Sequence, residues 1–216
     1  MWFSFRRNLG LVSIVLLWGT TAAARDADGH RPEITVLVYD SARTSPLVLE
    51  QAEREASRIF SGAGIGIAWV NCPKGPGNTE KSCHHPLNSG EFVLHIVPNG
   101  RTSTDFVFGL SFLDENGAGT YCDIFLKRIE EAQRDLGTSL PRLLGAVAAH
   151  ELGHLLLGSH AHSSVGIMTP RWEQETLSSL NRGSLLFTRE QAFRMQAHLH
   201  GSDLSLASLS GTGEHQ

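Results

Sequence analysis

The spacing of apolar residues changes along the first hundred residues from strand-like to helical and back. Residues 34–39 are almost continuously apolar or β-branched, which is typical of a strand covered on both faces. Residues 47–60 repeat apolar side chains at helical spacing, and Gly62 and Gly64 follow as stop signals. Residues 65–70 and 92–97 are two further expected strands, so the chain should begin with a parallel pair and a crossover helix. In the helix we expect Leu47, Ala52, Ala56, Ile59 and Phe60 to point inward and Glu50, Glu53, Arg54 and Arg58 to point outward.

The second half of the chain predicts a hairpin and two longer helices. Residues 106–113 and 120–126 are expected strands that flank the turn at 114–117, and residues 127–136 are expected to form a short linking helix. Thr138 or Ser139 can cap the next helix, with Pro141 in its first turn and Gly158 at its end. A last helix is capped by Thr188 and is expected to end near Leu199. The apolar positions that bury the helix before Gly158 are Leu143, Leu144, Val147, Leu152, Leu155 and Leu156. These elements predict an α+β fold with a twisted mixed sheet of about five strands.

The two ends of the chain have a different character from its middle. Residues 1–24 are typical of a secretory signal peptide, with Arg6 and Arg7, an apolar centre and the small residues Ala22-Ala23-Ala24. The apolar centre is too short to span a bilayer, so no stable membrane insertion is expected after cleavage. We therefore expect a secreted or periplasmic protein with one domain over residues 25–200 and a disordered, Ser/Gly-rich tail over residues 201–216.

The net charge and the cysteines limit the classes of function that the chain can have. Cleavage after Ala24 removes two arginines and no acidic residue, which changes the net charge from −4 to −6. A mildly acidic chain lacks the basic footprint of a nucleic-acid-binding protein. Of the three cysteines, Cys72 and Cys83 bracket a turn-rich loop and are the expected disulfide pair, whereas Cys122 lies in an apolar run and is expected to be buried.

The candidate chemistry lies in the buried helix, at His150-Glu151-Leu152-Gly153-His154. Side chains four residues apart share one face of a helix, so both imidazoles can reach one metal ion. Neutral imidazole binds zinc and leaves it Lewis-acidic, and an adjacent carboxylate can take and return protons. The HExxH spacing therefore predicts that His150 and His154 bind Zn²⁺ and that Glu151 is the general base.

A third ligand is expected where the chain turns back after Gly158, and both His160 and His162 are candidates. Further on, Gly166-Ile167-Met168-Thr169-Pro170 resembles the methionine-containing turn beneath the metal in the metzincin clan of zinc peptidases. That clan's signature is HExxHxxGxxH followed by such a turn. This sequence departs from it by one residue, because Leu157 stands where the clan has glycine.

We favour His162 as the third ligand. Three residues separate it from Gly158 and let the chain swing round, and the pair His162-Ser163 resembles matrix-metalloprotease-like sequences. His160 remains the alternative, because it keeps the clan's spacing to the first ligand and to the methionine. A glutamate from a following helix, Glu173 or Glu175, would resemble the gluzincins, but the glycine and proline breaks disfavour that arrangement.

The resemblance covers most of residues 33–200 and is to a group of exported bacterial proteins with a minimal metzincin-like domain. It includes the early strand-helix-strand unit, AHELGHLLLG, HSSVGIM with Trp172 after it, and LLFTREQ. It implies a zincin-like fold with an active-site helix, a Met-turn at Met168 and a C-terminal helix. It also implies that Gly109-Leu110-Ser111-Phe112 is the edge strand that holds a peptide substrate.

The leading hypothesis is a secreted zinc-dependent metalloendopeptidase that acts as a monomer on peptide or protein substrates. In it a zinc-activated water attacks the peptide bond and Glu151 is the general base. A second hypothesis is a zinc-stabilised binding module of the same fold without turnover, motivated by the displaced glycine. The sequence does not reveal the substrate.

Overall fold

The computed structural model describes residues 31–73, 83–100 and 107–210, with side chains to residue 201. The chain divides into the units Met1–His30 and Arg31–Gln216, and only the second contains described residues. The expected signal peptide lies outside them, so it and the domain boundaries remain predictions. Within the described part, no helix combines the length and apolar character needed to cross a membrane.

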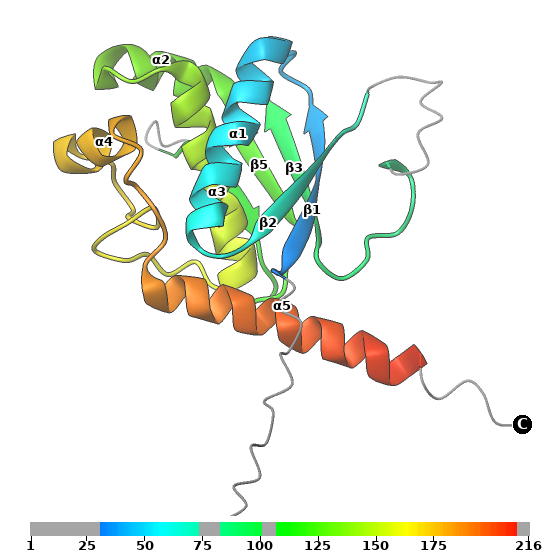
Figure 1. Cartoon of the computed structure of the whole chain (residues 1–216). Helices are drawn as coiled ribbons and strands as arrows, with labels where there is room; N and C mark the ends of the chain where they lie inside the picture. The colour runs from blue at the N-terminus through cyan, green and yellow to red at the C-terminus, as the bar shows by residue number, and fades with distance from the viewer. Residues whose placement is uncertain (1–30, 74–82, 101–106, 211–216) are drawn as a thin grey trace, which may run out of the picture. The chain divides into compact units, whose positions relative to one another are not determined.

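A mixed sheet of five strands in the order β2-β1-β3-β5-β4 forms the centre of the domain (Figure 1). Three parallel pairings join β2 to β1, β1 to β3 and β3 to β5, and β4 runs antiparallel to β5 at one edge. The strands are β1 Glu33–Asp40, β2 Gly66–Asn71, β3 Glu91–Val97, β4 Gly109–Phe112 and β5 Tyr121–Phe125. The predicted α+β class and mixed sheet are confirmed, and β4 is shorter than the sequence predicts.

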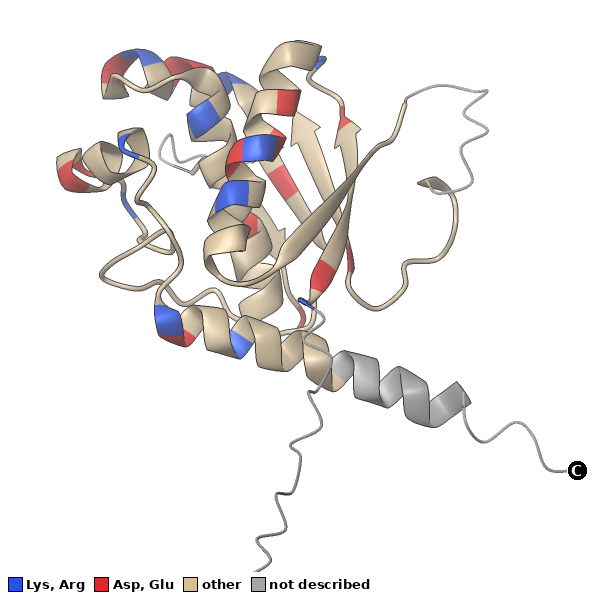
Figure 2. Ribbon diagram, viewed as in Figure 1, with Lys and Arg blue, Asp and Glu red and all other residues tan. Residues whose placement is uncertain are grey.

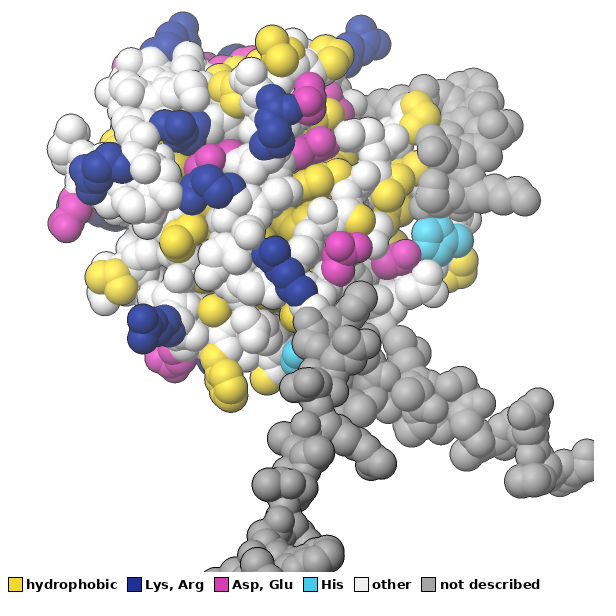
Figure 3. Space-filling model, viewed as in Figure 1, with side chains coloured by type: hydrophobic (Ala, Val, Ile, Leu, Met, Phe, Trp, Pro, Cys, Tyr) yellow, Lys and Arg dark blue, Asp and Glu magenta, His cyan; other side chains and the backbone are white. Residues whose placement is uncertain are grey.

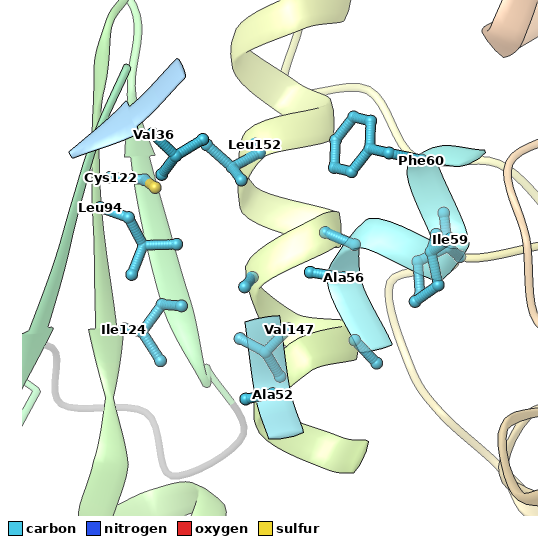
Figure 4. Close-up of a cluster of buried hydrophobic side chains, with 14 of the residues drawn as sticks. Val36, Ala52, Ala56, Ile59, Phe60, Leu94, Cys122, Ile124, Val147 and Leu152 are labelled. Carbon is cyan, nitrogen blue, oxygen red and sulfur yellow. The ribbon is translucent and has the colours of Figure 1, made fainter. Parts of the chain in front are cut away.

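One face of the sheet is covered by α1 (Pro46–Gly62) and α3 (Leu140–Leu157), which pack side by side. Figure 4 shows Val36, Leu94, Cys122 and Ile124 of the strands pointing at these helices, as alternation along a strand requires. The helices approach closely at Gly145, where a β-carbon would lie 2.3 Å from the Ala52 carbonyl oxygen. Of the residues expected inside α1, Leu47 is the exception: it lies in the first turn and is 59% exposed.

Three further helices complete the domain. Helix α2 (Leu126–Leu136) follows β5 directly, α4 (Gln174–Asn181) was not expected from the sequence, and α5 spans Arg189–Ser210. At the start of α5 the backbone N–H of Gln191 donates to the Thr188 hydroxyl, and the Thr188 N–H donates to the Gln191 side chain. This reciprocal cap explains the predicted start. The helix continues to Ser210, past the end expected near Leu199, and residues 211–216 of the expected tail lie outside the described residues.

The opposite face of the sheet carries a second, smaller apolar cluster around Leu37, Cys72 and Cys83. Cys72 and Cys83 form a disulfide, and the Tyr39 hydroxyl donates to the Cys83 carbonyl oxygen at 2.7 Å. These contacts tie the segment around Cys83 to this face. Cys122 is fully buried on the helix-covered face.

Charged side chains of both signs are mixed on the face of the molecule seen in Figures 2 and 3. In Figure 2 acidic and basic residues alternate along α1 and α2, and the face in Figure 3 shows Lys and Arg side chains interspersed with Asp and Glu. On α1, Arg58 pairs with Glu55 and Arg54 pairs with Glu50. This view therefore presents no continuous basic surface.

Candidate metal centre

Helix α3 positions the residues of the HExxH motif. Pro141 lies in its first turn, and Ser139 occupies the N-cap position but makes no side-chain capping bond. The helix ends at Gly158, whose φ of 61° is in the left-handed region that glycine adopts most easily. Because most of α3 is buried between α1, the sheet and the following loop, Glu151 and His154 are buried and His150 is partly buried.

The two histidines of the motif face each other through their Nε2 atoms, which lie 3.1 Å apart. The Nδ1 of His150 lies 2.8 Å from the Ile167 carbonyl oxygen, and the Nδ1 of His154 lies 2.7 Å from the Ser159 carbonyl oxygen. A carbonyl oxygen can only accept, so each Nδ1 carries a hydrogen. In neutral rings, both Nε2 lone pairs therefore point at each other.

This arrangement fits a zinc ion. Burial lowers the pKa of His150 to about 3 and that of His154 to about 4, so both rings are neutral at pH 7. Facing lone pairs repel unless a cation lies between them. Two nitrogens bound to Zn²⁺ at about 2.05 Å and at the tetrahedral angle would be roughly 3.3 Å apart, close to the 3.1 Å that separates these atoms. The backbone carbonyls also orient both rings, as outer partners of zinc-binding histidines commonly do.

The structure places His162 beside this pair. One ligand atom from each of His150, His154 and His162 lies within 4.8 Å of the others. The His162 ring centre is 5.3 Å from that of His150 and 5.0 Å from that of His154. Burial, and then the neighbouring His160, lower the pKa of His162 and favour its neutral form.

The other candidate ligands lie outside this cluster. The His160 ring centre is 5.9 Å from that of His154, and His160 lines the adjoining cavity without joining the three histidines. Glu173 and Glu175 are exposed at the start of α4 and do not join them either.

The loop after α3 is held in shape by contacts around Met168. The Ser163 backbone N–H donates to the Met168 carbonyl oxygen at 2.9 Å, and Gln191 of α5 donates to the Ser163 hydroxyl. Met168 is fully buried, and a β-carbon on Gly153 would lie 2.8 Å from its sulfur. Trp172 packs edge-on against His150 with ring centres 6.2 Å apart. The loop therefore supports α3 directly behind the histidines and fixes the chain next to His162.

Glu151 contacts two residues of the edge strand that the sequence assigned to substrate binding, and these contacts with Glu151 were not predicted. The Ser111 hydroxyl lies 2.7 Å from a carboxylate oxygen of Glu151 and 2.8 Å from its backbone carbonyl oxygen. A β-carbon on Gly109 would come within 2.6 Å of the Glu151 side chain. Burial raises the pKa of Glu151 to about 7, against the opposing effect of the Ser111 hydrogen bond. The signal in the sequence for this contact was a small residue, Gly109, and a hydroxyl residue, Ser111, on the inward side of an expected strand.

A cavity of about 1100 Å³ opens over these residues. Its walls include the edge strand β4, the three histidines with Glu151, the loop after Met168, and Lys127, Arg128, Glu131 and Asp135 of α2. Leu110 of β4 is 37% exposed and faces away from the buried Ser111. The site thus joins a candidate metal centre, a carboxylate and an open strand edge in one cleft.

Comparisons with known proteins bear on the fold. No protein-family model and no curated protein matches the sequence. Among solved structures, the chain is similar to a zinc-dependent peptidase from Methanocorpusculum labreanum (strain Z), with a TM-score of 0.50 and 15% identity over 74% of this chain and 99% of that chain. It also matches an archaemetzincin from Methanopyrus kandleri, with a TM-score of 0.46 and 17% identity over 80% of this chain and 98% of that one. At these identities the first match shows a shared fold.

Proposed function

We propose that this chain is a zinc-dependent metalloendopeptidase that hydrolyses peptide bonds. The observation that carries the proposal is the pair of Nε2 atoms 3.1 Å apart, each on a ring whose other nitrogen faces a carbonyl. The position of His162 and the buried Glu151 beside the pair support it. The fold shared with a solved zinc-dependent peptidase adds support.

His150, His154 and His162 would hold the zinc ion, with Met168 behind them as the Met-turn. Zinc bound by three neutral imidazoles supplies Lewis acidity, which polarises a carbonyl group and acidifies a water molecule. The Ile167 and Ser159 carbonyls keep the Nδ1 hydrogens of His150 and His154 in place, so both Nε2 lone pairs remain available.

Glu151 is the proposed general base. Its carboxylate accepts a proton from the attacking water and then passes it to the leaving amine nitrogen. A pKa near 7 suits both steps, because the group can hold and release a proton at neutral pH. Ser111 keeps the carboxylate in one orientation, which limits the rearrangement that each proton transfer requires.

The proposed substrate is an extended peptide or protein segment bound along β4. This strand pairs with β5 on one side only, and its residues Gly109, Leu110 and Ser111 line the cavity. An added peptide strand would gain main-chain hydrogen bonds there, and the cavity would select its side chains. The peptide bond would then lie close to Glu151, because Ser111 of the same strand contacts the Glu151 carboxylate.

We also propose that the protein acts as a secreted or periplasmic monomer after cleavage of residues 1–24. The disulfide between Cys72 and Cys83 supports an oxidising compartment. A zinc-stabilised binding module without turnover remains the competing function. Gly158 nevertheless ends α3 in a left-handed turn that returns the chain to His162, so the displaced glycine does not break up the cluster.

The deciding experiment compares the wild-type protein with the Glu151→Gln variant on a peptide library, with zinc content measured in both. We expect equal zinc and cleavage only by the wild type. If both bind zinc equally and neither cleaves any peptide, the endopeptidase proposal fails. Equal cleavage by the wild type and the Glu151→Gln variant would show that Glu151 is not the general base.

A further inference from the structure

A second cluster of chemically active side chains lies on the opposite face of the sheet from the candidate metal centre. His95 of β3 is paired in register with Asp123 of β5, and Tyr121 lies two residues before Asp123 on the same face. Ser41 directly follows β1, next to the strand that carries His95. Ser41 lies at the carboxyl end of β1, and His95 and Asp123 lie within the neighbouring strands β3 and β5, so three adjacent parallel strands bring these side chains together on one face of the sheet.

Hydrogen bonds connect the side chains of Ser41, His95, Tyr121 and Asp123, and the donor and acceptor of each bond can be assigned. The Tyr121 hydroxyl donates to Asp123 at 2.8 Å, so its oxygen accepts from the His95 Nδ1, which is also 2.8 Å away. The same Nδ1 lies 3.3 Å from the Asp123 carboxylate. In the neutral ring, Nε2 is then the bare nitrogen, and it lies 2.5 Å from the Ser41 hydroxyl oxygen. Ser41 therefore donates its hydrogen to a base that a carboxylate orients.

The loop that carries Ser41 is held by its own set of hydrogen bonds. The N–H groups of Ser41 and Ala42 donate to the Ile96 carbonyl oxygen at 2.7 and 3.1 Å. The Asp40 carboxylate accepts from the N–H groups of Ala42 and Thr44. These bonds hold the backbone of Ser41 against β3. The short serine side chain therefore reaches His95.

A cavity of about 470 Å³ adjoins the cluster. His95 and Asp123 line it together with the rings of Phe112, Tyr121 and Phe125, and Phe112 packs against Tyr121 with ring centres 5.3 Å apart. The side chains of His95 and Asp123 are 27% and 18% exposed, so solvent and a ligand can reach them. Ser41 is not among the residues that line this cavity, but its hydroxyl lies 2.5 Å from the Nε2 of His95, which does line it. The aromatic wall suits an apolar group attached to an ester.

We propose that Ser41, His95 and Asp123 form a second hydrolytic site, which cleaves small carboxylic esters with an apolar acyl group. The Ser41 oxygen forms a bond to the acyl carbon while its proton passes to His95 Nε2. The ester's C–O bond then breaks, and the leaving alcohol takes that proton. A water molecule repeats the sequence with His95 as base, which releases the carboxylic acid and restores Ser41. Tyr121 and Asp123 orient His95 and do not bond to the acyl group.

The site is tested on the mature full-length chain with a chelator present, so that metal-dependent hydrolysis is excluded. Two probes are used: hydrolysis of p-nitrophenyl butyrate, and covalent labelling by an alkyl fluorophosphonate, in which serine displaces fluoride. We expect a single adduct on the peptide containing Ser41. Ser41→Ala should abolish both signals, and His95→Gln should slow them by about 100-fold or more, the scale of a general base.

Ser45→Ala is the matched control, because Ser45 is an exposed serine of the same loop and makes no side-chain capping bond. It should leave both signals unchanged. Zinc binding by each variant, measured separately, reports that the fold is retained. The proposal is overturned if wild-type protein lacks either signal, if the adduct lies elsewhere, or if folded His95→Gln reacts like the wild type. The hydrogen-bonded cluster would then have a structural role alone.

Discussion

The choice between His162 and His160 as third ligand can be decided by zinc affinity. The structure brings the ligand atoms of His150, His154 and His162 within 4.8 Å of one another and leaves His160 outside that group. His162→Asn removes one of the three candidate ligand nitrogens. His160→Asn removes an exposed histidine two residues earlier in the same loop. The first change should weaken zinc binding strongly and the second only slightly.

The expected size follows from the role of each residue. Loss of an outer partner of a metal ligand typically costs 10–100-fold in affinity, so loss of a ligand itself should cost at least about 100-fold. At a free zinc concentration of about 1,000 times the wild-type Kd, zinc stabilises the wild type by about 4 kcal/mol. The same zinc concentration is only about 10 times the Kd of the weakened variant and stabilises it by about 1.4 kcal/mol.

Thermal unfolding measures this difference. For a domain of this size 1 kcal/mol corresponds to about 2–4 °C in Tm. Zinc should therefore raise the Tm of the wild type and of His160→Asn by roughly 8–16 °C, and that of His162→Asn by roughly 3–6 °C. Competition with a chromophoric chelator gives the Kd independently. A large loss in His160→Asn with wild-type behaviour in His162→Asn would refute this assignment and establish His160 as the ligand.

Three further predictions follow from particular contacts. Ser111→Ala removes the hydrogen bond to the Glu151 carboxylate. Steady-state kinetics should then show kcat reduced by roughly 10-fold, with KM and zinc affinity unchanged. A change in KM alone would contradict a positioning role for Ser111. Gly145→Ala places a β-carbon 2.3 Å from the Ala52 carbonyl oxygen and should lower the free energy of unfolding by about 1–3 kcal/mol in urea titrations. The control Gly201→Ala meets nothing within 4 Å in α5 and should be neutral or stabilising, so equal effects would argue against the close α1–α3 approach. In protein whose metal has been removed with a chelator, His150 takes up a proton below pH 6.5 in the unfolded chain but only near pH 3 in the folded chain. The free energy of unfolding therefore decreases as the pH falls. Between pH 8 and pH 5 wild type should lose about 2 kcal/mol more than His150→Asn, and parallel pH profiles would show that His150 is not buried as a neutral ring.

Local patterns in the sequence were sufficient for most of the elements and for the first half of the site. Helix α3 begins and ends where Pro141 and Gly158 predict, because both residues act through their own backbone conformation. The relation of His150, Glu151 and His154 depends only on helical geometry, which a spacing of four residues specifies. Cys72 and Cys83 lie close enough in sequence for one short loop to bring them together.

What the sequence did not decide depends on contacts between distant segments. The position of His162 beside His150 and His154 follows from a loop held by Met168 and Gln191. The contact of Ser111 with Glu151 requires β4 to lie against α3. The approach of Ser41 to His95 and Asp123 requires the pairing of β1, β3 and β5 in one register. Hydrophobic periodicity shows which face of a strand is buried, but strand order and register are set by packing over the whole sheet. The sequence by itself thus determined the helix that carries the histidine pair, and the tertiary structure decided which distant side chains lie beside it in each proposed site.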